Sequence, residues 1–75
     1  MHRLTITERE TLRIMIGLDP VWASLKEVAR IRNRSYGTIE KTFYSIQDKV
    51  RIEAYADVVE WARDHEVELN EHYRP

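Results

Sequence analysis

Residues 24–50 read SLKEVARIRNRSYGTIEKTFYSIQDKV and predict two helices joined by a tight turn. Ser24 stands three residues before Glu27 at the edge of an apolar run, which is the pattern of a capping box at a helix start. The short apolar face of this helix would consist of Leu25, Val28 and Ala29. We expect the helix to last about two turns.

Asn33 marks the turn, because asparagine tolerates the left-handed backbone that a tight turn requires. Ser35 follows it and can cap a second, longer helix. Apolar residues in that helix are spaced four, three and four apart, which is typical of a face turned toward a core. The stripe consists of Ile39, Phe43, Ile46 and Val50. The opposite face, left free to meet a partner, would carry Tyr36, Glu40, Lys41, Tyr44 and Asp48.

A helix is also predicted before this pair. Thr7 and Glu10 match the capping-box pattern, so we expect the helix to start there. Its apolar residues at helical spacing are Leu12, Met15 and Ile16. Gly17 offers the positive φ that commonly closes a helix, so the end is expected near Ile16. Asp19-Pro20 then imposes a short loop that carries Val21, Trp22 and Ala23.

A fourth helix is predicted after a break at residues 51–53. Its apolar residues are Tyr55, Val58, Val59 and Ala62. It should run to about His65, beyond which Val67 and Leu69 could pack back onto the core. Residues 70–75 are polar and expected to fray. With no alternation typical of strands, the sequence predicts an all-α, four-helix helix-turn-helix domain.

The composition predicts one small domain that spans residues 1–75. Hydrophobic residues make up 43% and charged residues of both signs 33%, which favours a packed helical domain over a disordered tail. The absence of cysteine excludes disulfides and thiolate zinc sites and fits a reducing cytoplasm, the expected localisation. The longest apolar run, from Ile14 to Leu18, is too short to span a bilayer, so no membrane partner is expected.

Charge is distributed unevenly along the chain. Residues 24–51 hold seven lysines and arginines against three acidic residues, a local excess of +4. Residues 52–75 hold two basic residues against seven acidic ones, or −5, while residues 1–23 balance. Such segregation predicts that the central segment attracts a polyanion and that the C-terminal third repels it.

Several short motifs are shared with known families of regulators. They are Leu4-Thr5, Glu8-Arg9-Glu10, Leu12, Glu27-Val28-Ala29, Ser35, Gly37-Thr38-Ile39 and Lys49. In these residues the chain resembles the DNA-binding domain of the LuxR/GerE family of bacterial regulators, without gaps from Lys26 to about Ala62. Gly17-Leu18-Asp19 together with residues 24–28 is more similar to the fourth region of primary sigma factors, which reads a promoter element. Both resemblances imply one helix-turn-helix architecture.

The chain departs from both families at several positions. Glu40 stands where LuxR-type domains usually carry a lysine that faces DNA and sigma factors an arginine. Tyr36 and Gly37 replace the arginine and glutamate that sigma factors present there, so their base contacts are not carried over. Arg32 and Arg34 occupy places that usually hold apolar turn residues.

Binding to double-stranded DNA would place the helix at about residues 35–50 in the major groove. The candidates for base-edge contacts are Tyr36, Thr38, Glu40, Lys41 and Tyr44. The candidates for phosphate contacts are Lys26, Arg30, Arg32, Arg34, Ser35 and Lys49. Taken alone, these residues are more typical of a solvated basic face without a ligand. The family resemblance reverses this preference and makes a DNA-binding transcription regulator the leading hypothesis.

The LuxR resemblance also implies a homodimer through the fourth helix, with a seam of Val58, Trp61 and His65. The residues alone leave a core role open for Trp61, because a small domain needs its large apolar groups. The alternative function is a sigma-region-4-like module that docks on RNA polymerase, a sigma factor or another regulator and binds little DNA itself. Glu40 and the acidic C-terminal third favour this alternative.

Catalysis is not expected, because the sequence has no cysteine, no glycine-rich phosphate loop and no serine in a nucleophile-elbow pattern. His2, His65 and His72 are too scattered to assemble three ligands. We therefore expect neither a metal nor another cofactor.

Overall fold

The computed structural model describes residues 4–18 and 24–70, and every regular element in these ranges is a helix. The helices are α1 (Ile6–Gly17), α2 (Leu25–Arg32), α3 (Tyr36–Val50), α4 (Tyr55–Asp64) and α5 (Glu66–Asn70). The all-α prediction is confirmed, but the described part of the chain holds one helix more than expected, because the segment after His65 forms α5. Of the tail expected to fray, Asn70 belongs to α5 and the remainder lies outside the described residues, as does the predicted loop with Trp22.

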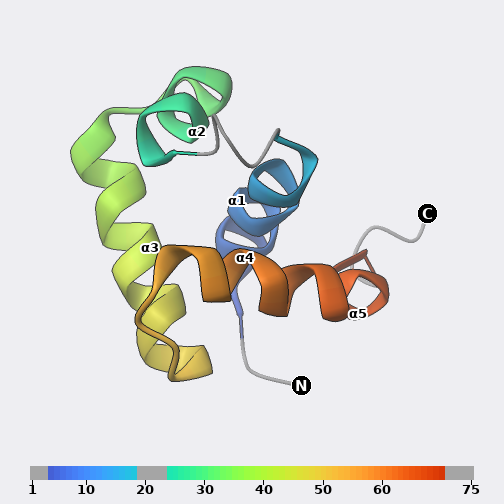
Figure 1. Cartoon of the computed structure of the whole chain (residues 1–75). Helices are drawn as coiled ribbons and strands as arrows, with labels where there is room; N and C mark the ends of the chain where they lie inside the picture. Colours follow the sequence, from blue (N-terminus) through green and yellow to red (C-terminus); the bar gives the residue numbers. More distant parts are fainter. Residues whose placement is uncertain (1–3, 19–23, 71–75) are drawn as a thin grey trace.

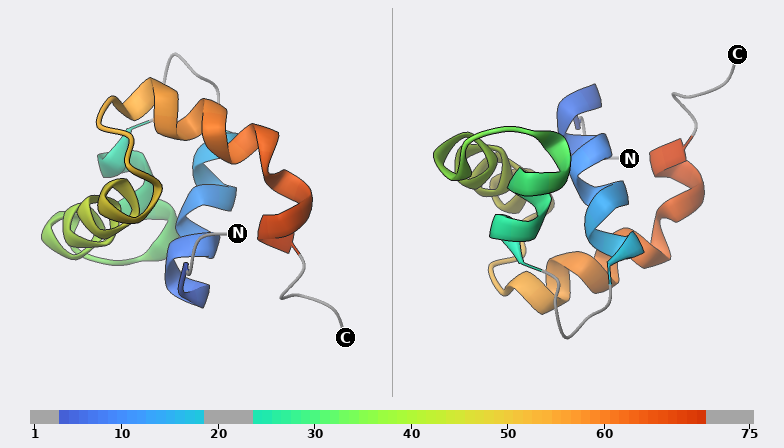
Figure 2. Two further views of the ribbon diagram at one scale, coloured as in Figure 1. Left: turned by 90° about the horizontal axis from the view of Figure 1, so that it is seen from below. Right: turned by 90° about the horizontal axis from the view of Figure 1, so that it is seen from above.

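α1 lies at the centre and contacts each of the other four helices. In Figure 1, α2 lies at the top, α3 runs along one side, and α4 crosses in front and leads to α5. In both views of Figure 2, α3 and α5 lie on opposite sides of α1. α3 therefore packs inward on α1 and α2, and no described helix covers its outer side. None of the described helices has both the length and the apolar character needed to cross a membrane.

The core gathers apolar side chains from all five helices. The predicted stripe on α3 is confirmed, since Ile39, Phe43, Ile46 and Val50 are each at most 6% exposed. Full burial of one such side chain contributes about 1.5–3 kcal/mol, so the stripe is the main anchor of α3. The other buried apolar residues are Leu4, Leu12, Met15, Val28, Ala29, Val58, Val59, Ala62 and Leu69.

α1 starts earlier than the sequence predicts. The N-cap is Thr5, so the predicted cap at Thr7 is wrong. The Thr5 hydroxyl accepts from the Glu8 N–H at 3.1 Å, and the Glu8 carboxylate accepts from the Thr5 N–H at 2.8 Å. Leu4, directly before the cap, is buried in the core. The helix therefore begins as the chain leaves the core at Leu4, and the second threonine falls inside the first turn.

α1 ends within one residue of the predicted end, but the left-handed conformation expected of Gly17 is wrong. Gly17 is the last residue of α1 and does not adopt a positive φ. Leu18 follows with an extended backbone, and its N–H donates to the Met15 carbonyl at 3.3 Å. Because Leu18 packs partly against the core, the chain leaves α1 without a left-handed residue.

The connection between α2 and α3 follows the prediction. Asn33 has φ 55° and ψ 48°, the left-handed conformation, and Ser35 caps α3. Ser24 caps α2 by accepting from the Glu27 N–H at 3.2 Å. The expected reciprocal half of that capping box is replaced, because the Glu27 carboxylate bonds to Arg30.

α5 is fixed against α1 by one apolar and one polar contact. Leu69 is fully buried, as expected, whereas Val67 is 79% exposed and the prediction that it packs on the core is wrong. The helical conformation of α5 places these two residues on different faces. The guanidinium of Arg9 donates to the carbonyls of Glu68 at 3.0 Å and Leu4 at 3.2 Å, which ties α5 to the start of α1.

Candidate nucleic-acid interface

The first turn of α3 is presented to solvent, with residues 34–38 all exposed. The Ser35 hydroxyl accepts from the Thr38 N–H at 3.2 Å and lies 2.8 Å from the Thr38 hydroxyl. Both hydroxyls are therefore engaged in starting the helix. Arg34 and Tyr36 remain as the groups of this turn whose side chains can reach outward.

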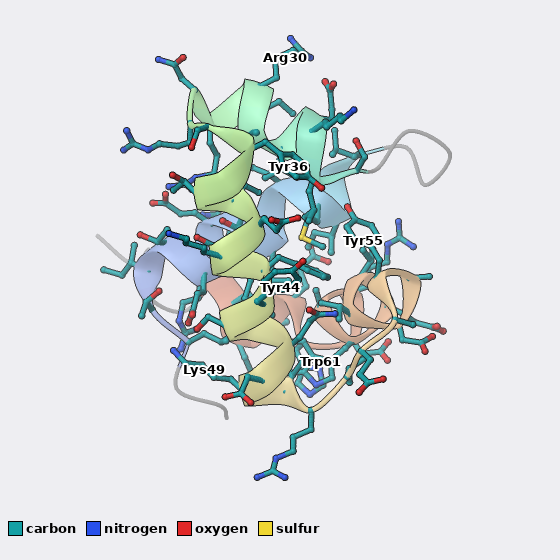
Figure 3. All side chains as sticks on the ribbon, turned by 90° about the vertical axis from the view of Figure 1, so that its left-hand side faces the viewer. Arg30, Tyr36, Tyr44, Lys49, Tyr55 and Trp61 are labelled. Atoms are coloured by element: carbon teal, nitrogen blue, oxygen red, sulfur yellow. The ribbon has the colours of Figure 1, made fainter. Side chains whose placement is uncertain are left out.

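The outer surface of α3 has two different flanks. Tyr36 and Tyr44, 44% and 57% exposed, lie on the flank nearer α4 (Figure 3). The helical period places Glu40 between them on the same flank. Lys49 lies on the opposite flank, beside α1 (Figure 3). Lys41 is exposed between the two flanks, at the outermost position of the helix.

The flank nearer α4 carries negative charge. The Glu40 carboxylate raises the pKa of the Tyr44 phenol, chiefly through its charge, with smaller effects from desolvation, a hydrogen bond between the two groups and Tyr36. Neither Glu40 nor Asp48 forms an ion pair with any described lysine or arginine. These carboxylates would repel a phosphate backbone, and they are available to pair with a cation of a ligand.

Half of the predicted phosphate contacts are cations that pair within the chain. The pairs are Lys49 with Glu8 at 2.8 Å, Arg32 with Glu10 at 2.9 Å, and Arg30 with Glu27. The side chains of Lys49 and Arg32 are only 33% and 13% exposed, so their charge is neutralised inside the fold and is not available to a phosphate. Arg30 is 73% exposed, and a surface pair of this kind is weak enough to open.

Three predicted contacts remain without an ion pair among the described residues. They are Lys26 in the first turn of α2, Arg34 in the turn, and Lys41 on α3, all exposed. Together they place positive charge at the end of the molecule formed by α2 and the start of α3. Arg51, just after α3, is a further exposed arginine outside the set of predicted contacts.

Glu8 holds α3 in place, a role that the sequence did not predict. One carboxylate oxygen accepts from the Thr5 N–H and from Lys49 Nζ, both at 2.8 Å, and the other accepts from the Ser45 hydroxyl at 2.6 Å. Burial raises the pKa of Glu8, but the bonds from Lys49, Ser45 and Thr5 outweigh it and leave the pKa below its ordinary value of 4.5. The buried carboxylate thus fixes the rotation of α3 about its axis.

The predicted dimer seam is only partly on the surface. Val58 is fully buried within one chain, so its assignment to the seam is wrong. The Trp61 ring stacks on the His65 ring with centroids 4.2 Å apart, and His65 Nδ1 lies 2.7 Å from the Trp61 carbonyl oxygen. Both residues are half-buried, and Trp61 also packs against the core.

No protein-family model matches the sequence, and neither a curated protein nor a solved structure is significantly similar to it. Among the described residues, no group of histidines and acids could hold a metal ion.

Proposed function

We propose that this chain is a helix-turn-helix transcription regulator of the LuxR/GerE kind, which binds double-stranded DNA by placing α3 in the major groove. The 15 residues of α3 extend about 22 Å, and the diameter of an α-helix, about 10–12 Å, fits the width of about 12 Å of the major groove. No described helix covers the outer side of α3, which supports this placement. The observation that carries the proposal is the exposed N-terminal turn of α3 with Arg34 and Lys41 available beside it.

The roles of the side chains follow from their positions. Lys41, outermost on α3, would reach base edges together with Tyr36. Lys26 and Arg34 would contact phosphates on either side and fix the register, with Arg30 joining them when its surface pair opens. Glu40 can accept from the amino group of a cytosine, but its charge repels the surrounding phosphates, so we expect its net effect on duplex affinity to be unfavourable.

Titration of a labelled duplex with matched variants tests this proposal. Arg34→Ala and Lys41→Ala should each weaken binding by about three- to tenfold, because each removes a charge at the proposed interface. Arg63→Ala is the control, since Arg63 is an exposed arginine on α4, away from the outer side of α3. Equal effects of all three substitutions would contradict the proposed orientation.

Pairing of two chains would offset the weak binding of one module, and we propose a homodimer through the exposed parts of Trp61 and His65. Light scattering at two protein concentrations tests this proposal. A mass that rises with concentration supports pairing, and a constant monomer mass rules it out.

A second candidate function is docking on another protein, such as RNA polymerase, a sigma factor or another regulator. The two unpaired carboxylates on the outer surface of α3, Glu40 and Asp48, favour this function, because they repel phosphates. Glu40 also lies between two exposed aromatic rings, and aromatic side chains are enriched at protein interfaces.

A further inference from the structure

The flank of α3 nearer α4 combines two exposed rings with one carboxylate. Tyr36, Glu40 and Tyr44 follow one another at intervals of one helical turn, so they form a continuous row about 12 Å long. Two of the large exposed hydrophobic residues of the described chain, Tyr36 and Tyr44, belong to this row (Figure 3). Residues four apart on a helix are neighbours, so Glu40 lies beside Tyr44, and its charge raises the pKa of the Tyr44 phenol.

An arginine side chain is the ligand that this chemistry fits best. Its guanidinium donates to a carboxylate through two parallel N–H groups and stacks its flat face on an aromatic ring. A carboxylate beside an exposed ring offers both contacts to one guanidinium, with an attraction of about 0.5–1 kcal/mol for the cation over the ring at an exposed site. Since a carboxylate accepts several hydrogen bonds, Glu40 has capacity for both N–H groups of the guanidinium.

A second acceptor lies further along the same helix. An open hollow of about 560 Å³ follows Tyr44 at the junction of α3 and the α3–α4 connection. Its lining consists of Tyr44, Gln47, Asp48, Arg51, Ile52 and Glu53. Gln47 is held there by donating its side-chain N–H to the Glu53 carbonyl. Asp48 is exposed at this hollow and lies eight residues beyond Glu40, or about 12 Å along the helix.

We propose that the row Tyr36–Glu40–Tyr44, with the adjoining hollow, binds an arginine-bearing segment of a partner protein. One arginine pairs with Glu40 and stacks on Tyr36 or Tyr44, and a second, about two helical turns away in the partner, pairs with Asp48. The inference rests on the second candidate function, not on DNA binding. Because both ligands use the outer surface of α3, the partner and DNA exclude each other.

Binding of a labelled, alanine-rich helical peptide with two arginines about two turns apart tests the inference. The full chain should bind this peptide about tenfold more tightly than the same peptide with glutamines in place of the arginines, because each arginine adds a charged pair. A lysine version should bind less tightly than the arginine version, since an ammonium lacks the planar fork. Equal binding of the arginine and glutamine peptides would overturn the inference.

Variants of the chain locate the site. Glu40→Gln keeps the shape of the side chain and should lower the affinity for the arginine peptide about tenfold. Glu60 is an exposed acid on α4, and Glu60→Gln should leave this affinity unchanged. Tyr44→Phe should bind within about twofold of the original chain, and Tyr44→Ala should bind less tightly, because only the ring is needed for stacking. An unchanged affinity of Glu40→Gln for the peptide would contradict the site.

The same variant separates the two candidate functions. Glu40→Gln should lower the affinity of the chain for the arginine peptide and raise its affinity for duplex DNA, because the carboxylate attracts the peptide and repels the DNA. Absence of DNA binding in a chain that still binds the peptide therefore contradicts the DNA-binding proposal and does not affect the proposed arginine site. Absence of peptide binding contradicts the arginine site and leaves the DNA-binding proposal standing.

Discussion

The Glu8 carboxylate and the Lys49 ammonium lie 2.8 Å apart although 41 residues separate them in the chain. This pair joins the first turn of α1 to the last turn of α3. The same carboxylate also accepts a hydrogen bond from the Ser45 hydroxyl and one from the Thr5 N–H at the start of α1. Both proposed ligands meet the outer surface of α3, so the orientation of that surface depends on a buried contact behind it.

Replacing the buried acid should destabilise the fold. Glu8→Gln removes the charge that Lys49 faces and keeps the size of the side chain, so we expect the free energy of unfolding to fall by about 1–2 kcal/mol. Urea denaturation followed by circular dichroism measures this change. Glu60→Gln, an exposed acid on α4, is the control and should change stability little. Equal stability of both variants would show that the Glu8 contacts contribute nothing.

The pH dependence of stability has a definite sign. Burial raises the pKa of Glu8, but the bonds from Lys49, Ser45 and Thr5 together lower it by more than burial raises it. The pKa in the folded state therefore lies below the ordinary 4.5. A lowered folded pKa stabilises the protein above the unfolded pKa, and this stability is lost as the pH falls through the folded value. Thermal unfolding between neutral pH and about pH 3 should therefore show a smaller acid loss for Glu8→Gln than for the original chain. Parallel curves for both proteins would contradict this assignment.

The start of α1 can be tested with two threonines. Thr5→Ala removes the hydroxyl that caps the helix and should cost about 1 kcal/mol of stability. Thr7→Ala changes an exposed residue inside the first turn and should be nearly neutral. The comparison by urea denaturation distinguishes the two capping patterns directly, and a larger loss for Thr7→Ala would support the start that the sequence predicts.

Reversing the charge at Glu40 probes whether the outer side of α3 meets DNA. Glu40→Lys replaces a carboxylate by an ammonium at the position where the resembled families carry a cation, so duplex affinity should rise by about tenfold. Fluorescence anisotropy with a labelled duplex measures this gain. Asp64→Lys on α4 makes the same change of charge away from α3 and should raise affinity much less. An equal gain for both variants would indicate a general charge effect without docking of α3.

Local signals predicted most of the fold. The stripe from Ile39 to Val50 has the helical period of a buried face, and Asn33 and Ser35 have the local chemistry of a turn and a cap. The start of α1 was mispredicted because Thr5 and Thr7 are each followed three residues later by a glutamate. The local pattern fits both, and only the burial of Leu4 decides between them.

Long-range pairing was not predictable from these patterns. The sequence assigned Lys49 and Arg32 to phosphates because it showed their charge but not the acids that would face them. Glu8 and Glu10 reach these cations only after α1 packs against α2 and α3. The net charge of the central segment therefore overstated the cations available to DNA. Long-range packing also explains the wrong assignment of Val58 to the dimer seam, because the burial of Val58 follows from the packing of α4 against α1.

The salt dependence of duplex binding tests the central claim most directly. With Lys26 and Arg34 on phosphates, and Arg30 joining them when its surface pair opens, a plot of log affinity against log salt concentration should have a slope of about −3. Lys26→Ala should make the slope shallower by about 1, because one fewer counterion is released. No binding at low salt, or binding that does not change with salt, would contradict the account.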